Sequence, residues 1–343
     1  MSTNPFERTR HQFAPQQITL SYLRPGSPLP LIVRAAVEGV DLVGWASANT
    51  AFIQSYLLRN GAILFRDFNL PAARDFERVI ESVSGPLLDH SYRSTPRHVV
   101  NGRICSSTEY PANQAIPLHN ENSYTRSWPM KLAFHALQVA EKGGETPLAD
   151  CRKVYQAMPE DIRECFVRKG LMYVRNYGTS LDIPWQEVFQ TSSKAVVEDY
   201  CRKVRMEFEW IGAAQIRTRQ EAQVAAVHPG TGETVWFNQA HLFHASRLPL
   251  VVRDWLLNSY GEENLPRNVY FADGSSIEDA MLDEIMRVYE EQAVVFPWRQ
   301  GDVLMLDNML TAHGRKPFEG ERKLEVGRAE SYLSVANVPN AVG

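Results

Sequence analysis

The sequence lacks the features that mark membrane proteins, secreted disulfide-rich proteins and zinc-binding domains. Its four cysteines form no CxxC pair, so we expect reduced thiols and neither a zinc cluster nor a disulfide framework. Unbroken apolar runs such as Val303 to Leu306 are short, whereas a transmembrane helix needs roughly 18 apolar residues or more. The first 30 residues contain no apolar core of a secretory signal. We therefore expect a cytosolic protein with no membrane partner.

Charge is also nearly balanced. The chain has 36 basic and 40 acidic residues, for a net charge of −4, and no basic block of the kind that follows a phosphate backbone. We therefore expect no nucleic acid as a partner. With 44% hydrophobic and 22% charged residues among 343, the composition is that of an ordinary globular protein. No linker divides the chain, which predicts an N-terminal extension (residues 1–30) and one domain (31–343) with a helical insert at about 180–290.

The apolar pattern predicts a mixed fold with a β core. A helix is expected over 42–58 with its end at Asn60-Gly61, a buried strand over 62–66 and a helix over 71–84. Further helices are expected at 150–168, 194–204, 249–259 and 276–291, and further strands at 98–139, 171–177, 222–228, 233–238, 292–297, 303–307 and 323–335. The pattern has no strict β-α-β alternation and no glycine-rich loop after a strand. It therefore argues against a Rossmann or P-loop enzyme and favours a closed or sandwiched β core.

Two short segments contain residues suited to a metal site. His119 and Glu121 lie two apart in the first, and His313 follows the expected strand 303–307 in the second. Two histidines and one carboxylate on one face leave three open positions, as in non-haem Fe(II) oxygenases. Each has an ordinary alternative. His119 and Glu121 could be a surface histidine beside a solvated glutamate, and His313 could be a hydrogen-bonded structural histidine.

Arg322 lies on an expected turn after His313. A guanidinium beside a metal face suits bidentate capture of a dicarboxylate. The alternative is a surface ion pair with Glu319 or Glu321.

Taken together, the segments resemble the TauD/TfdA (taurine dioxygenase-like) family of Fe(II)- and 2-oxoglutarate-dependent oxygenases. The resemblance extends from about Gly61 to Leu333. The segments that carry it are Ile63 to Phe68, Ile116 to Tyr124 (IPLHNENSY), Gly143 to Tyr155 (GGETPLADCRKVY), Gly232 to His244 (GETVWFNQAHLFH) and Gly301 to Arg322. It implies a double-stranded β-helix (jelly roll, clavaminate synthase-like) with flanking helices, and Fe(II), 2-oxoglutarate and O₂ as cofactor and cosubstrates.

The resemblance also implies roles for individual residues. His119, Glu121 and His313 match the iron ligands. Thr146 and Arg322 match the hydroxyl and the arginine that hold the distal carboxylate of 2-oxoglutarate, with Arg328 as the alternative arginine.

The chain departs from the family pattern at two positions. Glu121 stands where most members have Asp, although amino-acid hydroxylases of the clavaminate synthase type also use Glu. Because halogenating relatives have a small residue there, Glu121 favours hydroxylation. Val326 stands where members that act on free acids often have a second arginine, four residues after Arg322, and Arg328 is the remaining candidate for that role.

The full set of motifs looks most like the syringomycin-type aspartyl β-hydroxylases of non-ribosomal peptide pathways. This resemblance predicts hydroxylation of an amino acid or a derivative of one, held as a thioester on a carrier protein, in antibiotic or other specialised metabolite biosynthesis. The alternatives are a free small acid or sulfonate as substrate, a desaturation or cyclisation outcome, and a metal-binding jelly roll without turnover. The oligomeric state stays open. The candidate substrate residues, each of which is equally compatible with a structural role, are Arg93, Arg97, Asn238 and His241.

Overall fold

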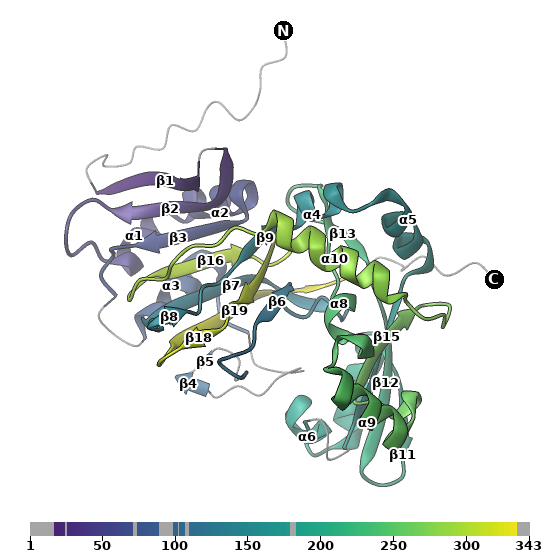
Figure 1. The fold of residues 1–343 in the computed structure, drawn as a ribbon. Helices are drawn as coiled ribbons and strands as arrows, with labels where there is room; N and C mark the ends of the chain where they lie inside the picture. The colour runs from purple at the N-terminus through teal and green to yellow at the C-terminus, as the bar shows by residue number, and fades with distance from the viewer. Residues whose placement is uncertain are drawn as a thin grey trace.

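The computed structural model describes residues 17–24, 26–70, 74–88, 99–101, 103–106, 110–178 and 183–334. Its largest element is an eight-stranded sheet that runs through the left half of Figure 1. In spatial order its strands are β1 (Ile18–Arg24), β2 (Ser27–Ala35), β3 (Ala62–Arg66), β16 (Val303–Asp307), β7 (Ser127–Gln138), β19 (Lys323–Leu333), β5 (Ile104–Ser106) and β4 (Val99–Asn101).

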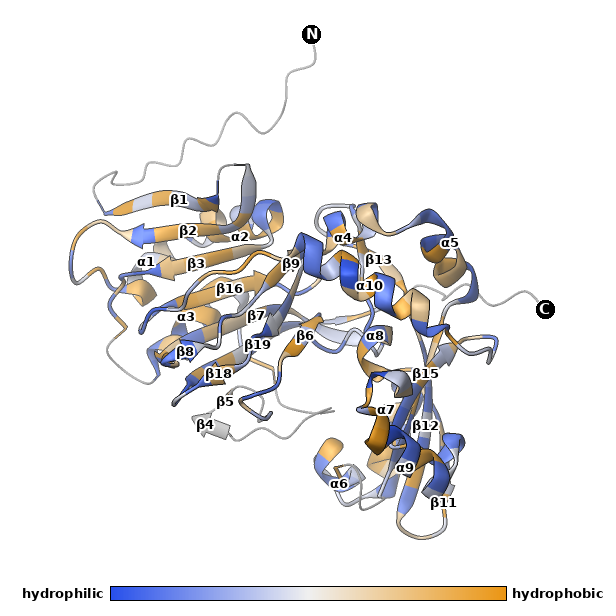
Figure 2. Cartoon of the chain, in the orientation of Figure 1, coloured by the Kyte–Doolittle hydropathy of each residue, from blue (hydrophilic) through white to orange (hydrophobic). Residues whose placement is uncertain are grey.

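The central strands of this sheet are buried on both faces. All five residues of β3 and all five of β16 are buried, and Figure 2 colours these strands hydrophobic along most of their length. Alternate side chains point to opposite faces of a strand, so Ile63 and Met305 join one core cluster while Leu64 and Leu304 join another. The sheet is therefore the wall between two apolar cores.

Three helices cover the first of these faces. They are α1 (Leu42–Ala48), α2 (Thr50–Asn60) and α3 (Asp75–Ser84). The expected helix over 42–58 is divided in two because Asn49 ends α1, its backbone N–H bonding back to the carbonyl of Ala46. The Asp41 carboxylate caps the start of α1 by accepting bonds from the N–H groups of Val43 and Gly44.

The second face looks toward small sheets that complete the double-stranded β-helix. One consists of β6 (Ile116–His119), β17 (Thr311–Arg315) and β9 (Leu148–Asp150), and another pairs β18 (Phe318–Glu319) with β8 (Lys142–Gly143). A third pairs β13 (Ala225–Val227) with β14 (Thr234–Trp236), the hairpin predicted around Pro229 to Gly232. The expected fold, a β-helix with flanking helices, is confirmed.

The remaining strands form a separate lobe, at the lower right of Figure 1. This four-stranded sheet has the order β11 (Glu207–Ile211), β12 (Gln215–Ala222), β10 (Leu171–Tyr177) and β15 (Arg267–Phe271). Its helices, and those that connect it to the β-helix, are α4 (Cys151–Ala157), α5 (Glu160–Lys169), α6 (Trp185–Val188), α7 (Lys194–Lys203), α8 (Ala240–Phe243), α9 (Leu250–Tyr260) and α10 (Asp279–Gln292). The third apolar core packs among these elements.

Some expected boundaries differ from the observed elements. The helix expected over 150–168 is two helices, because Met158 is extended and Pro159 cannot continue α4. The segment at about 180–290 contains the five strands β11 to β15 as well as helices, so it is mixed rather than helical. The boundary at residue 30 falls inside β2, because β1 and β2 pair and add to the sheet edge. The strand expected over 292–297 is reduced to an isolated β-bridge between Val294 and Leu148.

Among the described residues, no helix is long and apolar enough to cross a bilayer.

Candidate metal centre and cofactor pocket

Three side chains with metal-ligating atoms converge where β6 meets β17. In this antiparallel pair His313 lies opposite His119, and their ring centroids are 4.6 Å apart. Glu121 follows two residues after the end of β6. One donor atom from each of His119, Glu121 and His313 lies within 4.8 Å of the other two. The sequence-predicted triad is thus brought together by strands that are far apart in the chain.

The donor set fits a small cation. Bonds of about 2 Å from an ion to nitrogen or oxygen place ligand atoms within roughly 4 Å of one another, so small side-chain rotations would close the observed arrangement on one ion. Nδ1 of His119 lies 2.9 Å from the carbonyl oxygen of Pro117. Since a carbonyl only accepts, Nδ1 carries the proton and Nε2 is left as the ligand atom, the usual orientation of a metal-binding histidine.

Close backbone packing brings β17 up to β6. A Cβ atom at Gly314 would lie 2.6 Å from the carbonyl oxygen of Ile116, so only glycine allows the strands to approach at the residue after His313. The ligand turn is fixed from the other side by Gln239, whose Nε2 donates to the Asn120 carbonyl at 2.6 Å.

A cavity of about 490 Å³ opens beside the triad, and His119 and Glu121 form part of its wall. Aromatic and aliphatic side chains such as Tyr124 and Phe243 line it together with a few polar groups. This volume lies within the roughly 300–1,000 Å³ of pockets for drug-sized ligands. Apart from Glu121, the charged lining residues are Arg247 and Arg267, so the wall away from the triad is cationic.

Arg322 lies at a second, smaller cavity of about 200 Å³, which Trp298 and Leu324 also line. Its Nε donates to the Gly144 carbonyl at 2.8 Å, and no described residue accepts a hydrogen bond from its two terminal nitrogens. Burial, helped by the neighbouring Arg315 guanidinium, lowers the pKa of Arg322 to about 10. The group is therefore a desolvated cation with an open fork, which suits a carboxylate ligand.

The GGET segment shapes the same small cavity. Gly144 has a φ of +73°, and a Cβ there would lie 2.9 Å from Cδ of Arg322. Thr146 is buried, and its hydroxyl accepts a hydrogen bond from Nε1 of Trp298 at 3.1 Å. Trp298, which no sequence motif indicated, thus connects Thr146 to the cavity that Arg322 lines.

Arg328 occupies a different place. Its Nη1 donates to Oε1 of Glu121 at 3.2 Å, and both side chains are almost fully buried. On β19 it shares a face with Leu324 and Val326, the face that packs toward Phe134 and, through that ring, His313. The two arginines between which the sequence left a choice therefore contact different groups: Arg328 the candidate ligand carboxylate and Arg322 the GGET segment.

The predicted substrate residues fall into three groups. His241 lines the large cavity, and burial lowers its pKa to about 4, so the ring is neutral and its Nε2–H donates to the Leu118 carbonyl at 2.8 Å. Asn238 is buried and bonded at both ends to backbone, to the Val224 carbonyl and the Ala240 N–H. Arg93 and Arg97 lie outside the described residues.

Sequence reasoning missed Arg247 and Arg267. Arg247 lies after α8 and forms an ion pair with Asp283 at 2.6 Å, and Arg267 lies over the ring of Phe243 at 5.6 Å. Arg247 lies three residues after the segment Gly232 to His244 and Arg267 lies on β15, and both line the same cavity. Neither residue belongs to a short motif, so local sequence patterns do not indicate them.

Comparison with known proteins gives consistent relationships. The model of the family described as "Taurine catabolism dioxygenase TauD, TfdA family" matches residues 24–328. The dapdiamide synthesis protein DdaC of Enterobacter agglomerans is 39% identical over 90% of this chain and 98% of its own length. A clavaminate synthase-like protein of Arabidopsis thaliana is 31% identical over 80% of this chain and 82% of its own.

Solved structures are similar in fold. PvcB, described as an Fe, alpha-ketoglutarate dependent oxygenase from an isonitrile synthetic pathway, superimposes with a TM-score of 0.56. The match covers 95% of this chain and 97% of PvcB at 16% identity.

Proposed function

The chain belongs to the TauD/TfdA family of dioxygenases, and from that premise we propose that it hydroxylates an amino-acid substrate held as a thioester on a carrier protein. The protein is an Fe(II)- and 2-oxoglutarate-dependent dioxygenase. The observation that carries the oxidative part of the proposal is the convergence of the His119, Glu121 and His313 donor atoms at a 490 Å³ cavity that His119 and Glu121 line. A metal-binding jelly roll without turnover is not consistent with membership of this family.

We assign the iron to His119, Glu121 and His313. When bound, iron and 2-oxoglutarate activate O₂ for attack on an unactivated C–H bond, with succinate and CO₂ as by-products. The protein orients the ligands: Pro117 holds the His119 ring and Arg328 holds one oxygen of Glu121. Because a carboxylate ligand is present where halogenating relatives have a small residue, hydroxylation is the proposed outcome, and desaturation or cyclisation is the alternative.

We assign the distal carboxylate of 2-oxoglutarate to Arg322 and Thr146. The open guanidinium fork in a small cavity supports this choice. Arg328 is less suited because it already donates to Glu121.

The proposal of a tethered amino acid depends on what surrounds the large cavity. Val326 is buried in an apolar cluster with Phe134, so the position where free-acid enzymes have a second arginine offers no cation. The cavity is lined by the basic residues Arg247, which also pairs with Asp283, and Arg267. These residues suit an anionic group on an attached arm. The name of the relative DdaC, a synthesis protein, supports a role in specialised metabolism.

One observation favours the alternative of a free acid or sulfonate. The same two arginines, Arg247 and Arg267, would also bind the anionic end of an unattached substrate. The two proposals differ in whether the small substrate alone is turned over.

The experiment measures succinate formation with three substrate forms: free amino acids, aminoacyl-pantetheine thioesters, and the same aminoacyl groups loaded on a carrier protein. We expect turnover with the loaded carrier and little or none with the free amino acids. Comparable turnover of the free acids would overturn the carrier proposal and favour the alternative.

The cofactor assignment is tested separately and without a substrate. Fe(II) and 2-oxoglutarate added anaerobically to the metal-free protein should produce the weak visible charge-transfer band of a chelated keto acid. We expect His313→Ala to abolish the band while the protein remains folded. A band that persists in this variant would show that the iron ligands are assigned wrongly.

A further inference from the structure

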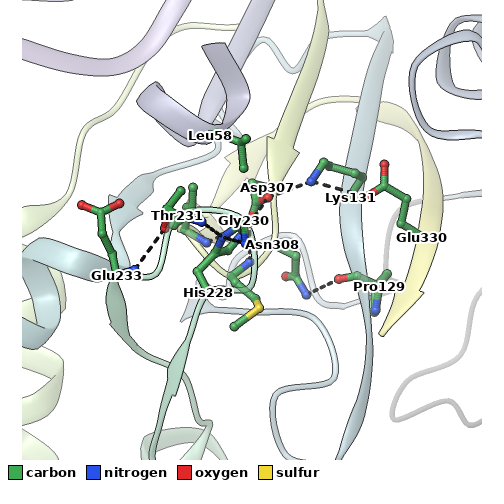
Figure 3. A network of polar contacts seen from close by, with 12 residues as sticks. Leu58, Pro129, Lys131, His228, Gly230, Thr231, Glu233, Asp307, Asn308 and Glu330 are labelled. Carbon is green, nitrogen blue, oxygen red and sulfur yellow. Dashed lines mark hydrogen bonds and ion pairs between the residues drawn. The ribbon is translucent and has the colours of Figure 1, made fainter. Parts of the chain in front are cut away.

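Asn308 makes a set of hydrogen bonds to the segment that carries two of the candidate ligands. Its Oδ1 accepts from the backbone N–H of Glu121 at 2.8 Å, and its Nδ2 donates to the Glu121 carbonyl at 2.9 Å. Nδ2 also donates to the Pro129 carbonyl at 2.8 Å, the contact drawn in Figure 3. The carbonyl of Asn308 accepts from Nδ2 of Asn120 at 2.6 Å. The side chain is fully buried, so these bonds do not compete with water.

The residue before Asn308 is fixed by a buried charge cluster. Oδ2 of Asp307 accepts from Nζ of Lys131 at 2.8 Å and lies 3.2 Å from Nε2 of His228. Figure 3 shows Lys131 and His228 approaching Asp307 from different sides, with Glu330 beyond Lys131. Nδ1 of His228 is in turn an acceptor for two N–H groups of the Pro229 to Gly232 turn. Asp307 therefore ties β16 to β7 and to the β13–β14 hairpin.

Asp307 also shapes the turn that leads to the third candidate ligand. Its Oδ1 accepts from the N–H groups of Met309 and Leu310 at 3.0 and 3.1 Å. The chain then enters β17, where His313 lies opposite His119. One turn thus presents Asn308 to the Glu121 peptide and, five residues later, places His313.

We infer that Asn308 is a positioning residue that holds the Glu121 peptide at a set distance from the two imidazoles, and that the Asp307, Lys131 and His228 cluster holds Asn308. The inference rests on the proposed iron site. Without the Asn308 amide, the Glu121 N–H and carbonyl lose these two bonds in a buried site. The bonds made by Asn120 and Gln239 then hold the ligand turn less firmly against β17. The carboxylate would then reach the ion less often in the bonding geometry.

The test compares metal affinity with stability. Metal-free full-length protein is titrated anaerobically with Fe(II) against a competing chelator, for the wild type and for Asn308→Ala. We expect the dissociation constant for Fe(II) to rise about 10- to 100-fold, the range seen when partners of metal ligands are removed. The free energy of unfolding of the metal-free protein is measured alongside.

Asn176→Ala is the matched control. Asn176 is also buried, and its Nδ2 donates to two backbone carbonyls, those of Glu263 and Leu265, but it lies in the four-stranded lobe. We expect it to lose stability without weakening Fe(II) binding. If Asn308→Ala bound Fe(II) as tightly as Asn176→Ala does, the inference would be wrong.

Two further variants separate the possible failures. If Asn308→Ala does not fold, the nearly isosteric Asn308→Asp keeps the acceptor for the Glu121 N–H but places an oxygen against the Glu121 and Pro129 carbonyls. We again expect the dissociation constant for Fe(II) to rise. Unchanged Fe(II) binding by Asn308→Asp would overturn the inference. His313→Ala tests the iron site itself: if it lost no affinity, the proposed site would fail, whereas loss in His313→Ala alone would leave the site intact and reject only the role of Asn308.

Discussion

At the scale of single residues, the two buried arginines near the candidate iron site should be separable by experiment. Replacing Arg322 with Gln removes a charged hydrogen-bond partner of a carboxylate, which costs about 1.5–3 kcal/mol, so the KM for 2-oxoglutarate should rise about 10- to 100-fold. Arg328→Gln should raise this KM much less, because Arg328 contacts Glu121 instead. Steady-state kinetics with varied 2-oxoglutarate checks the order. The reverse order would exchange the two assignments.

Gly144, in the GGET segment, should also affect the KM for 2-oxoglutarate, because a side chain there would collide with Arg322. Gly144→Ala would place a Cβ 2.9 Å from Cδ of Arg322, so the guanidinium must shift, and we expect the KM for 2-oxoglutarate to rise. Gly274→Ala is the matched control, since Gly274 has a similar positive φ but no atom within 4 Å of its would-be Cβ. If Gly144→Ala raised the KM for 2-oxoglutarate no more than Gly274→Ala does, the contact with Arg322 would not govern this KM.

The sequence could indicate these residues only where a short motif surrounds them. His119 and Glu121 share one motif and Gly144 and Thr146 another, so their proximity follows from local chain geometry. Asn308 lies within a motif, yet its role depends on Glu121 and Pro129, which are about 180 residues away in the chain. Arg267 has no motif at all. Residues whose partners are set by the packing of whole elements cannot be found from local patterns.

At the scale of elements, β16 should be sensitive to truncation of its side chains, because all five of its residues are buried. Leu304→Ala removes a fully buried side chain from the cluster that faces the candidate iron site, and we expect a loss of about 2–5 kcal/mol in the free energy of unfolding. Urea denaturation measures this loss.

Leu20→Ala on the edge strand β1 is the control for the same chemical change. Leu20 is 45% exposed, so its truncation should change the free energy of unfolding by about 0.5 kcal/mol or less. If both variants lost a similar free energy of unfolding, burial on β16 would not be the reason for the loss in Leu304→Ala.

The difference between buried and exposed strands also explains which elements the sequence predicted well. Strand β3 and strand β16 are short apolar runs bounded by turn residues, and both were predicted residue for residue, as was the helix end at Asn60-Gly61. The breaks at Asn49 and Met158 were missed because the apolar period continues across them. The strands of the lobe were partly hidden because β11 and β12 carry many polar residues, and an exposed strand has a weaker apolar signal than a buried one.

At the scale of the whole molecule, the arrangement places one sheet between a helix-covered core and a core that faces the candidate iron site. Ile63 and Leu64 are neighbours on β3 but belong to different cores. A shift of this strand by one residue would therefore turn the side chains of each core toward the other. The register that stabilises the fold therefore also sets the position of β7 and β19, which carry Phe134 and Arg328 toward the triad. Stability and site geometry depend on the same strands.

The buried cluster around Asp307 should make the stability of the whole molecule depend on acid. Burial alone would raise the pKa of Asp307, but Lys131 on β7 and His228 beyond β13 outweigh it, and the pKa lies below its ordinary value; Glu330 on β19 faces the cluster through Lys131 at 3.6 Å. A depressed pKa means that the stabilisation is present above the unfolded-state pKa of about 3.9. It is lost as the pH falls through the folded-state value.

Asp307→Asn tests this expectation. It leaves Lys131 buried without its main partner, so we expect a loss of about 3–5 kcal/mol at pH 7, and a shallower decline than the wild type below about pH 4. Glu319→Gln, which breaks the exposed pair with Lys142, should change the free energy of unfolding by less than about 1 kcal/mol. Urea denaturation between pH 7 and 3 measures all three proteins. If Asp307→Asn and the wild type declined in parallel below pH 4, other carboxylates would govern the acid response and the cluster would not.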